Sequence, residues 1–317
     1  MIIYGAGLAG LLAAQMLRRF QPVIYEAQLT LPHNHTALLR FRSEFVSQAI
    51  GIPFREVQVY KAVKSCGQVR SVLTLRDANL YSHKVTGQLI ERSILSLEPV
   101  KRYIAPPDLV AQMSRNVVIE YGQVIQTAEQ IQQHEQQYHW IVSTIPMPVL
   151  MEIVQWPKDD EMAFQFKSIW TVTARIAEPM VRLYQTIYYP EADDAYYRAS
   201  VTDDILIIEY MQPVETLKIA ESHIASILRD FGLDTGCVEG VVITHQKYGK
   251  LIPARSNQAR KSFMFTMTQR YRLYSLGRFA TWRQVLLDDV VKDVGVIESL
   301  MASREAYDQH LASAREG

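Results

Sequence analysis

The stretch that decides the fold is residues 1–26, MIIYGAGLAGLLAAQMLRRFQPVIYE. It predicts a short apolar strand over residues 1–4, a glycine-rich turn, an apolar helix from Leu11 to about Leu17, and a second strand that ends at Glu26. Strand, glycines, helix, strand and acid in this order are typical of a dinucleotide-binding unit. Together they are much more specific than a lone run of glycines.

Each position of the glycine-rich turn has a physical role in holding a dinucleotide. Gly5 permits the tight turn, Gly7 lets the backbone approach a pyrophosphate, and Gly10 allows the helix to pack closely on the strand. The helix N-terminus offers free N–H groups and the positive end of its dipole, and Glu26 can accept hydrogen bonds from a ribose. A glycine-rich turn without a ligand is the alternative interpretation. The expected cofactor-binding residues here are Gly5, Gly7, Leu8, Ala9, Gly10, Glu26 and Ala27.

The composition is that of an ordinary soluble globular protein. The chain has 317 residues, enough for one large domain or two intertwined domains, and 48% of them are hydrophobic and 21% charged. The formal net charge is zero, so the bulk electrostatics require neither a nucleic-acid nor a membrane partner. The two cysteines, Cys66 and Cys237, lack the spacing of metal ligands, and no metal site is predicted.

The apolar N-terminus differs from a secretory signal peptide. Arg18 and Arg19 follow the apolar run instead of preceding it, and the glycines interrupt it. No uninterrupted apolar stretch reaches the length that spans a membrane. We therefore expect a cytoplasmic protein without a membrane partner.

Later apolar stretches fall into two groups. Residues 117–122 predict a strand that returns the chain to the dinucleotide-binding unit, and residues 139–146 predict another, an apolar buried strand closed by proline. An antiparallel, substrate-facing sheet is predicted over residues 170–176, 181–189, 196–201 and 205–211. The predicted fold class is α/β, a Rossmann-like cofactor-binding domain with a parallel sheet plus an inserted antiparallel-sheet substrate domain (α+β). We place the cofactor domain in residues 1–55, 100–150 and 240–317, and the substrate domain in residues 56–99 and 151–239.

These pieces together resemble the flavoprotein superfamily of amine oxidases, protoporphyrinogen oxidase and UDP-galactopyranose mutase. The likeness is carried by four stretches: Gly5 to Glu26, Trp140 to Pro146, Tyr188 to Ser200, and Leu276-Gly277-Arg278-Phe279-Ala280 with Trp282 and Asp288-Asp289-Val290. The last is the most specific. It looks like the family's C-terminal flavin motif, in which a Gly-Arg strand end meets a helix N-terminus beside the flavin.

The resemblance implies FAD as the cofactor, because a nicotinamide-binding protein would not need the C-terminal Gly-Arg segment. A helix that opens at Asp288 presents unpaired N–H groups, and its dipole can stabilise negative charge on the flavin N1/O2 edge. Arg278 can hold a phosphate or a flavin carbonyl, and a structural salt bridge is its alternative. The resemblance thus adds to the expected cofactor-binding residues Gly277, Arg278, Asp288, Asp289 and Val290.

The sequence departs from the family after the ribose acid. The family usually has a Gly-Gly-Arg or Gly-Gly-Asn turn there, whereas this chain reads Pro32-His33-Asn34-His35-Thr36. The approach to the isoalloxazine is therefore built differently, and the family's catalytic details do not transfer. Histidine as a residue type can act as acid, base or hydrogen-bond donor near neutral pH, so His33 and His35 are candidate catalytic residues, with capping of the following segment as the alternative.

Basic and aromatic residues supply the remaining candidates. Lys247 lies in a segment that, by resemblance, passes near the flavin, where a lysine can hydrogen-bond a water near N5. Arg40 and Arg42 can hold an anionic substrate such as a nucleotide or a DNA phosphate, or else form a solvated surface. Tyr197 and Arg198 can line a substrate cavity, although tyrosines in a sheet more often serve packing.

The resemblance implies an enzyme, an FAD-dependent, amine oxidase-like oxidoreductase that removes a hydride from a carbon next to nitrogen. Hydrolysis of the resulting imine gives C–N cleavage of an amine or amino-acid-like substrate. A small molecule fits, and so does a nucleotide or an aminoacyl-modified thymidine in DNA, the latter if the chain is a compact phage-type member linked to DNA base hypermodification in a host cytoplasm. The alternatives are a UDP-galactopyranose mutase-like, non-redox flavoenzyme acting on a nucleotide sugar, and a flavin-binding protein without turnover.

Overall fold

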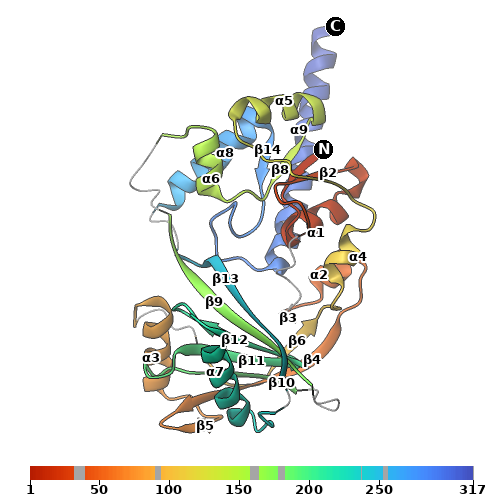
Figure 1. The fold of residues 1–317 in the computed structure, drawn as a ribbon. Helices are drawn as coiled ribbons and strands as arrows, with labels where there is room; N and C mark the ends of the chain where they lie inside the picture. Colours follow the sequence, from red (N-terminus) through yellow and green to blue (C-terminus); the bar gives the residue numbers. More distant parts are fainter. Residues whose placement is uncertain are drawn as a thin grey trace.

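The computed structural model describes residues 1–31, 40–89, 94–157, 164–177, 183–236, 238–252 and 256–316, and it contains two sheets, in the upper and lower halves of Figure 1. The upper sheet has five strands in the order β14-β8-β1-β2-β7, and all its strand pairs are parallel. These strands are β1 (Ile2–Tyr4), β2 (Val23–Glu26), β7 (Val118–Tyr121), β8 (Ile141–Ser143) and β14 (Leu273–Ser275). The N-terminal strand and a strand from the last fifth of the chain therefore share one sheet.

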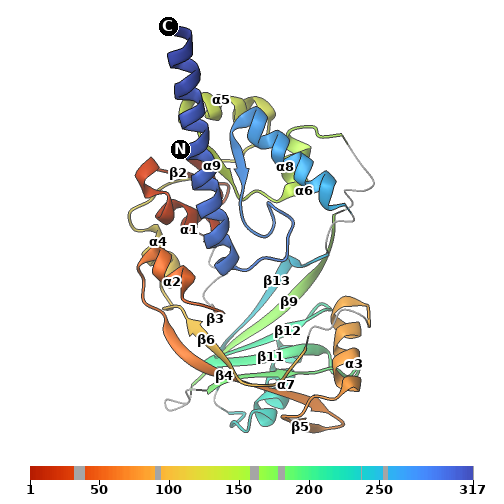
Figure 2. The ribbon, with the colours of Figure 1, turned by 180° about the vertical axis from the view of Figure 1, so that it is seen from behind.

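Helices cover both faces of this parallel sheet. They are α1 (Leu8–Met16), the short 3₁₀ helix η1 (Arg18–Phe20), α2 (Phe45–Ile50), α4 (Leu109–Ser114), α5 (Ala128–Tyr138), α6 (Met147–Ile153), α8 (Asn257–Tyr271) and α9 (Leu287–Glu316). On one face, Leu11 of α1 and Val290 of α9 lie in the same core as Ile3, and Figure 2 shows α9 lying across α1. On the other face, Phe263 of α8 packs in one cluster with Ile2. This arrangement confirms the predicted Rossmann-like half of the fold.

The lower sheet has nine strands, in the order β13-β9-β12-β11-β10-β4-β6-β3 with β5 added on β4. They are β3 (Arg40–Phe41), β4 (Arg55–Ser65), β5 (Gln68–Arg70), β6 (Val100–Ile104), β9 (Gln165–Ile176), β10 (Leu183–Tyr188), β11 (Tyr196–Asp203), β12 (Ile205–Tyr210) and β13 (Val238–Ile252). The predicted antiparallel strands are confirmed in β9 to β12. The sheet as a whole is mixed, because β4 and β10 run parallel.

Alternation along the strands gives the lower sheet two different faces. Ala199 and Val201 of β11 pack in one apolar core with α7 (Leu217–Asp230). Ser200 lies between these two residues in the strand and Arg198 precedes them; both point to the opposite face, where they line a cavity. One face of the sheet is therefore a core and the other is a polar surface turned toward a space.

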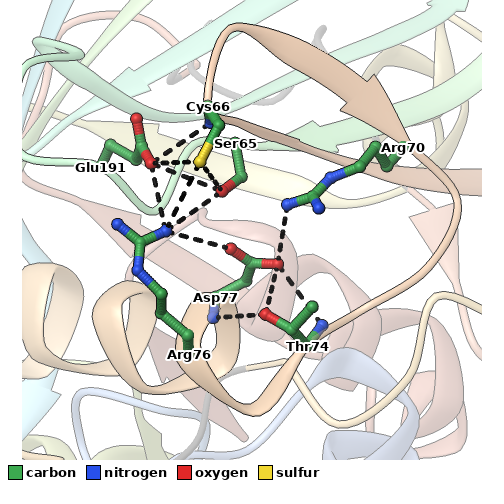
Figure 3. A network of polar contacts seen from close by, with 7 residues as sticks. All are labelled: Ser65, Cys66, Arg70, Thr74, Arg76, Asp77 and Glu191. Carbon is green, nitrogen blue, oxygen red and sulfur yellow. Dashed lines mark hydrogen bonds and ion pairs between the residues drawn. The ribbon is translucent and has the colours of Figure 1, made fainter.

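A polar network fixes α3 (Leu75–Thr86) to the lower sheet (Figure 3). At the start of the helix, Thr74 Oγ1 accepts the Asp77 N–H at 3.1 Å and the Asp77 carboxylate accepts the Thr74 N–H at 3.4 Å, which is a capping box. Arg70 at the end of β5 pairs with Asp77 at 3.3 Å, and Arg76 pairs at 3.3 Å with Glu191, which follows β10. The helix is thereby tied to two separate parts of the sheet.

Strands from ranges assigned to both predicted domains meet in the lower sheet. β3, β6 and much of β13 come from ranges that we placed in the cofactor domain. Of these, β6 pairs with β4 and β13 pairs with β9, which belong to the predicted substrate domain, and β3 pairs with β6. The exact domain boundaries stay a prediction. Among the helices that the structure describes, none is both long enough and apolar enough to cross a membrane.

Candidate cofactor and substrate site

Two glycines of the first turn are required by the packing of the protein itself. Gly5 has φ +94°, and a Cβ added to it would lie 2.3 Å from Thr144 Oγ1, beyond the end of β8. A Cβ on Gly10 would lie 2.0 Å from the carbonyl oxygen of Gly5. Any side chain at either position would push α1 away from the sheet, so these glycines fix where the helix begins.

Gly7 is different, because it faces open space. It is the N-cap of α1, and a Cβ added there would meet no atom within 4 Å. Below it, the Glu26 carboxylate accepts the Ala6 N–H at 2.6 Å and the Gln28 N–H at 2.9 Å, which holds the acid against the turn. The open approach to a helix N-terminus beside a fixed acid fits the pyrophosphate and ribose of a dinucleotide.

The C-terminal Gly-Arg segment lies directly against this turn. Gly277 follows β14 with φ +87°, and a Cβ added to it would lie 3.0 Å from the Cβ of Ala9. In the same turn region Leu8 is buried, whereas Ala27, after the second strand, is exposed. The structure therefore brings together the two stretches that carried the family resemblance most strongly, although they are separated by more than 260 residues.

Arg278 retains an unused hydrogen-bond donor. Its Nη2 donates to the carbonyl oxygen of Gly249 at 3.2 Å, while its Nε is buried and has no partner among the described residues. Burial lowers the pKa of Arg278, and Tyr197 opposes that shift. A buried guanidinium N–H without a protein acceptor is costly unless a ligand accepts from it, so the residue fits a cofactor oxygen beside Gly277.

The start of α9 has partners of its own. The Asp288 carboxylate accepts the backbone N–H groups of Ser43, at 3.1 Å, and Arg42, at 3.4 Å, and Asp289 accepts the Leu286 N–H at 2.9 Å. Val290 is buried in the core with α1. Asp288 therefore holds the two residues that follow β3, and Asp289 caps its own helix. The role of both as cofactor contacts stays a prediction.

A cavity of about 710 Å³ lies on the polar face of the lower sheet. Leu286, at the start of α9, is part of its wall, so the cavity reaches the cofactor-binding half of the molecule. Its charged lining consists of one acid and five cations, namely Glu209, Arg40, Arg42, Lys61, Arg102 and Arg198. The cavity wall also contains the hydroxyl groups of Thr171, Thr173, Thr186, Ser200 and Thr244. A strongly cationic, hydroxyl-rich wall suits an anionic, polar substrate.

The predicted substrate residues divide into different environments. Arg42 and Arg198 line the cavity. Arg40 also reaches it, but its guanidinium donates to Thr186 and Thr202 and to a carbonyl, and burial, with the charge of Arg198, lowers its pKa to about 10. Tyr197 is not part of the described cavity wall; it is buried among apolar side chains and donates to Glu209 at 2.9 Å. We therefore interpret Tyr197 as a support for Glu209.

Glu209 and Arg198 form a bidentate ion pair near Lys250, which was not among the predicted site residues. Arg198 donates to both Glu209 oxygens, at 2.7 Å through Nη2. Burial opposes ionisation of Glu209, but Arg198 holds its pKa below the ordinary value. Lys250 stands 5.1 Å from the Tyr197 ring, and burial, reinforced by Arg198 and opposed by Glu209, lowers its pKa to about 8.

The candidate catalytic residues have different outcomes. Lys247 is exposed and rests over the neighbouring Tyr248 ring, so it does not reach the Arg198–Glu209 pair. Three residues on, Lys250 contacts the ring of Tyr197, which donates to Glu209, although Lys250 is not part of the described cavity wall. His33 and His35 lie outside the described residues. Within the described part of the chain, no group of three or more histidine, cysteine, aspartate or glutamate side chains is placed to bind a metal ion.

Solved structures match nearly the whole chain, whereas no protein-family model and no curated protein sequence matches it. A structure of reduced UDP-galactopyranose mutase superposes with a TM-score of 0.67 at 13% identity, covering 95% of this chain and 93% of the other. A protein assigned as a protoporphyrinogen oxidase from an Exiguobacterium species gives 0.64 at 12% identity, with coverages of 95% and 98%. An oxidoreductase from Methanosarcina mazei gives 0.58 at 12%, with coverages of 94% and 99%. The chain has the fold of these proteins, as the sequence resemblance predicted.

We expect Glu209→Gln to change both stability and the titration of Lys250. The free energy of unfolding should fall by about 1–2 kcal/mol, because Arg198 keeps its charge and loses a partly buried partner. The pKa of Lys250 should fall below about 8, because the Glu209 charge raises it. Denaturant unfolding measures the first effect, and the pH dependence of Lys250 acylation, followed by mass spectrometry, measures the second. Glu239→Gln, at an exposed site on β13, is the control and should leave both quantities unchanged. An unchanged Lys250 titration in Glu209→Gln would contradict the placement of Lys250 near Glu209.

Proposed function

We propose that this protein is an FAD-dependent oxidoreductase whose cofactor is held by both ends of the chain. The observation that carries the proposal is the contact of Gly277 with Ala9, which places the Gly-Arg segment beside the open N-terminus of α1. The fold shared with an oxidoreductase and with UDP-galactopyranose mutase supports it. Gly7 and Glu26 would hold the phosphates and the ribose, and Arg278 would donate its free N–H to a cofactor oxygen.

We further propose that the reaction is oxidation of a C–N bond in an anionic substrate. FAD, when bound, supplies the acceptor for the two electrons that this oxidation releases. Lys250 is the group in the described structure best suited to take the proton from the substrate nitrogen, because its lowered pKa leaves a sizeable neutral fraction near pH 8. Water then hydrolyses the imine to a carbonyl compound and an amine. An amino acid satisfies these requirements, and an aminoacylated thymidine in DNA does so as well.

A second candidate is a non-redox rearrangement of a nucleotide sugar, as in a UDP-galactopyranose mutase-like enzyme. It is favoured by the wall of the cavity, where cations alternate with hydroxyl groups in the way that a phosphorylated sugar requires. Such an enzyme needs arginines that grip a pyrophosphate, for which Arg198 and Arg278 are the candidates, but the guanidinium of Arg198 is already paired with Glu209. Other cations of the wall would have to bind the phosphates.

Gly7→Ala should weaken FAD binding strongly without disturbing the fold. The added methyl group meets no protein atom within 4 Å, but it occupies the space through which a pyrophosphate would approach. We expect at least a tenfold loss of FAD affinity and a loss of stability of no more than about 1 kcal/mol, the cost of alanine at an N-cap. Flavin absorbance titration and thermal unfolding measure the two effects.

Gly295→Ala is the matched control for Gly7→Ala. Gly295 lies within α9, and an added Cβ there also meets no atom within 4 Å. This variant should bind FAD like the wild type and gain up to about 1 kcal/mol of stability from the better helix former. If Gly7→Ala bound FAD as tightly as Gly295→Ala does, the cofactor would not lie at this turn. Wild-type protein that takes up no FAD would contradict the proposed function altogether.

Anaerobic mixing of the FAD-loaded protein with candidate substrates should separate the two reactions. C–N oxidation predicts that an amino acid or an aminoacylated thymidine bleaches the flavin absorbance, faster as the pH rises through about 8 because Lys250 then loses its proton. Lys250→Met should slow bleaching by about 100-fold and remove this rise, whereas Lys247→Met should not. Turnover of a nucleotide sugar only after reduction with dithionite, without bleaching by any amine, would overturn C–N oxidation in favour of the second candidate. A protein that binds FAD but does neither would be the non-catalytic alternative.

A further inference from the structure

We propose that Arg42, Lys61 and Arg102 form a subsite that binds a phosphate or diphosphate group of the substrate. The proposal deepens the proposed function, because it rests on the same cavity and assigns the part of the substrate that is not the reacting centre. Lys61 and Arg102 were not predicted as site residues. The three side chains line the cavity from β4, from β6 and from the residue that follows β3.

The strand register puts these three residues on one face of the sheet. β3 and β6 pair Arg40 with Ile104 and Phe41 with Tyr103, and the next residues along the two chains, Arg42 and Arg102, both line the cavity. Val57 of β4 pairs with Arg102, and Lys61 lies four residues further along the same strand, on the same side. The intervening Phe41 is buried against Phe54, as expected for the other face.

The three cations are close enough to repel one another. Burial lowers the pKa of Arg102, and the charge of Arg42 lowers it further. Burial likewise lowers the pKa of Lys61, and here Arg102 adds to the effect. Arg102 therefore stands between two other positive charges. Like charges gathered around one cavity repel one another, so an anion bound there would lower their electrostatic free energy.

No carboxylate of the described residues forms an ion pair with any of the three. Arg102 donates to the Lys101 carbonyl at 2.7 Å, and Lys61 donates to the Ser96 carbonyl at 3.5 Å. Glu98 and Asp288 act on Lys61 and Arg102 only through their longer-range fields. The remaining N–H groups of these side chains are thus available to a ligand that lies in the cavity.

The other two cations of the wall make the contrast clear. Arg40 is bound by two threonines and a carbonyl, and Arg198 is neutralised by Glu209. The described residues thus hold two of these cations in place, and among those residues the other three cations have no ion-pair partner. Planar guanidinium groups and an ammonium around one space match a phosphoryl group, which offers several oxygens and about two negative charges.

The subsite lies at a useful distance from the proposed reacting centre. Arg102 lies on β6, and β4 and β10 stand between β6 and β11, which carries Arg198, so these two strands are about 14 Å apart at the usual spacing of about 4.8 Å. A cavity of about 710 Å³ is within the usual range for small-molecule sites. A substrate anchored by its phosphoryl group at Arg102 could therefore extend across Thr186 and Ser200 to Arg198 and Glu209.

Calorimetric titration of the FAD-loaded protein with pyrophosphate and with UDP tests the subsite. We expect binding that weakens as the salt concentration rises, and at least a tenfold loss of affinity in Arg102→Gln and in Arg42→Gln, because each removes charge-assisted hydrogen bonds. Lys101→Gln is the matched control: Lys101 is the neighbour of Arg102 on β6, but it is exposed and pairs with Glu56. Its affinity should equal that of the wild type.

Thermal unfolding distinguishes a binding role from a structural one. Removal of a repelled charge should leave the unfolding temperature of Arg102→Gln unchanged or raise it, and Arg102→Lys should recover part of the affinity. A single-stranded DNA oligonucleotide, titrated in parallel, identifies the source of the phosphate: dependence of its binding on Arg102 would indicate a phosphodiester, and dependence for UDP alone would indicate a free nucleotide. If neither UDP, pyrophosphate nor DNA bound more tightly to the wild type than to Arg102→Gln, the subsite would be overturned. Retained flavin absorbance in that same sample would leave the proposed FAD enzyme standing.

Discussion

The contact between Gly277 and the first turn of α1 is the constraint on which the rest of the structure depends. It goes together with the addition of β14 to the parallel sheet beside β8, and it sets Gly277 against Ala9, two residues after Gly7. Gly5 and Gly10 are fixed by close packing within the protein, whereas Gly7 faces open space. The protein thus builds a rigid turn and leaves one side of it accessible, as expected for a turn that holds a ligand.

The same segment also connects the two halves of the candidate site. Arg278 contacts the carbonyl of Gly249, and the next residue, Lys250, lies beside the Arg198–Glu209 pair. At the other side, Asp288 binds the backbone that carries Arg42. Short polar contacts therefore join the proposed cofactor site to both ends of the substrate cavity.

The sequence predicted the fold well wherever local patterns are strong. Residues 1–26 contain a full strand, turn, helix and strand, and the structure places the helix start only three residues earlier than expected, at Leu8. Side-chain directions in the long strands were harder. Lys247 was predicted from the resemblance, which indicates a segment and not the direction of each side chain. β13 has an irregular register between Gln246 and Lys250, and such an irregularity changes which face a side chain occupies, so the sequence did not separate Lys247 from Lys250. A similar irregularity between Tyr196 and Arg198 lets Tyr197 as well as Arg198 reach Glu209.

Contacts between distant residues were beyond the reach of local patterns. Asp288 binds the backbone of Ser43, and the like charges of Arg42 and Arg102 meet only because β3 pairs with β6. Both strands are short, and nothing in the sequence of β3 or β6 indicates that they pair with each other. Glu209 did leave a signal that was not used: it is a single acid in the otherwise apolar strand ILIIEY, which is unusual unless the acid has a partner.

A crystal structure of the protein grown with FAD tests the central claim most directly. The account predicts one FAD molecule whose pyrophosphate lies at Gly7, whose ribose lies at Glu26, and whose remaining part is contacted by Gly277 and Arg278. The flavin end should open into the cavity that Arg198 and Glu209 line. Density for FAD elsewhere on the protein, or at the turn of α1 without any contact to the Gly-Arg segment, would contradict it.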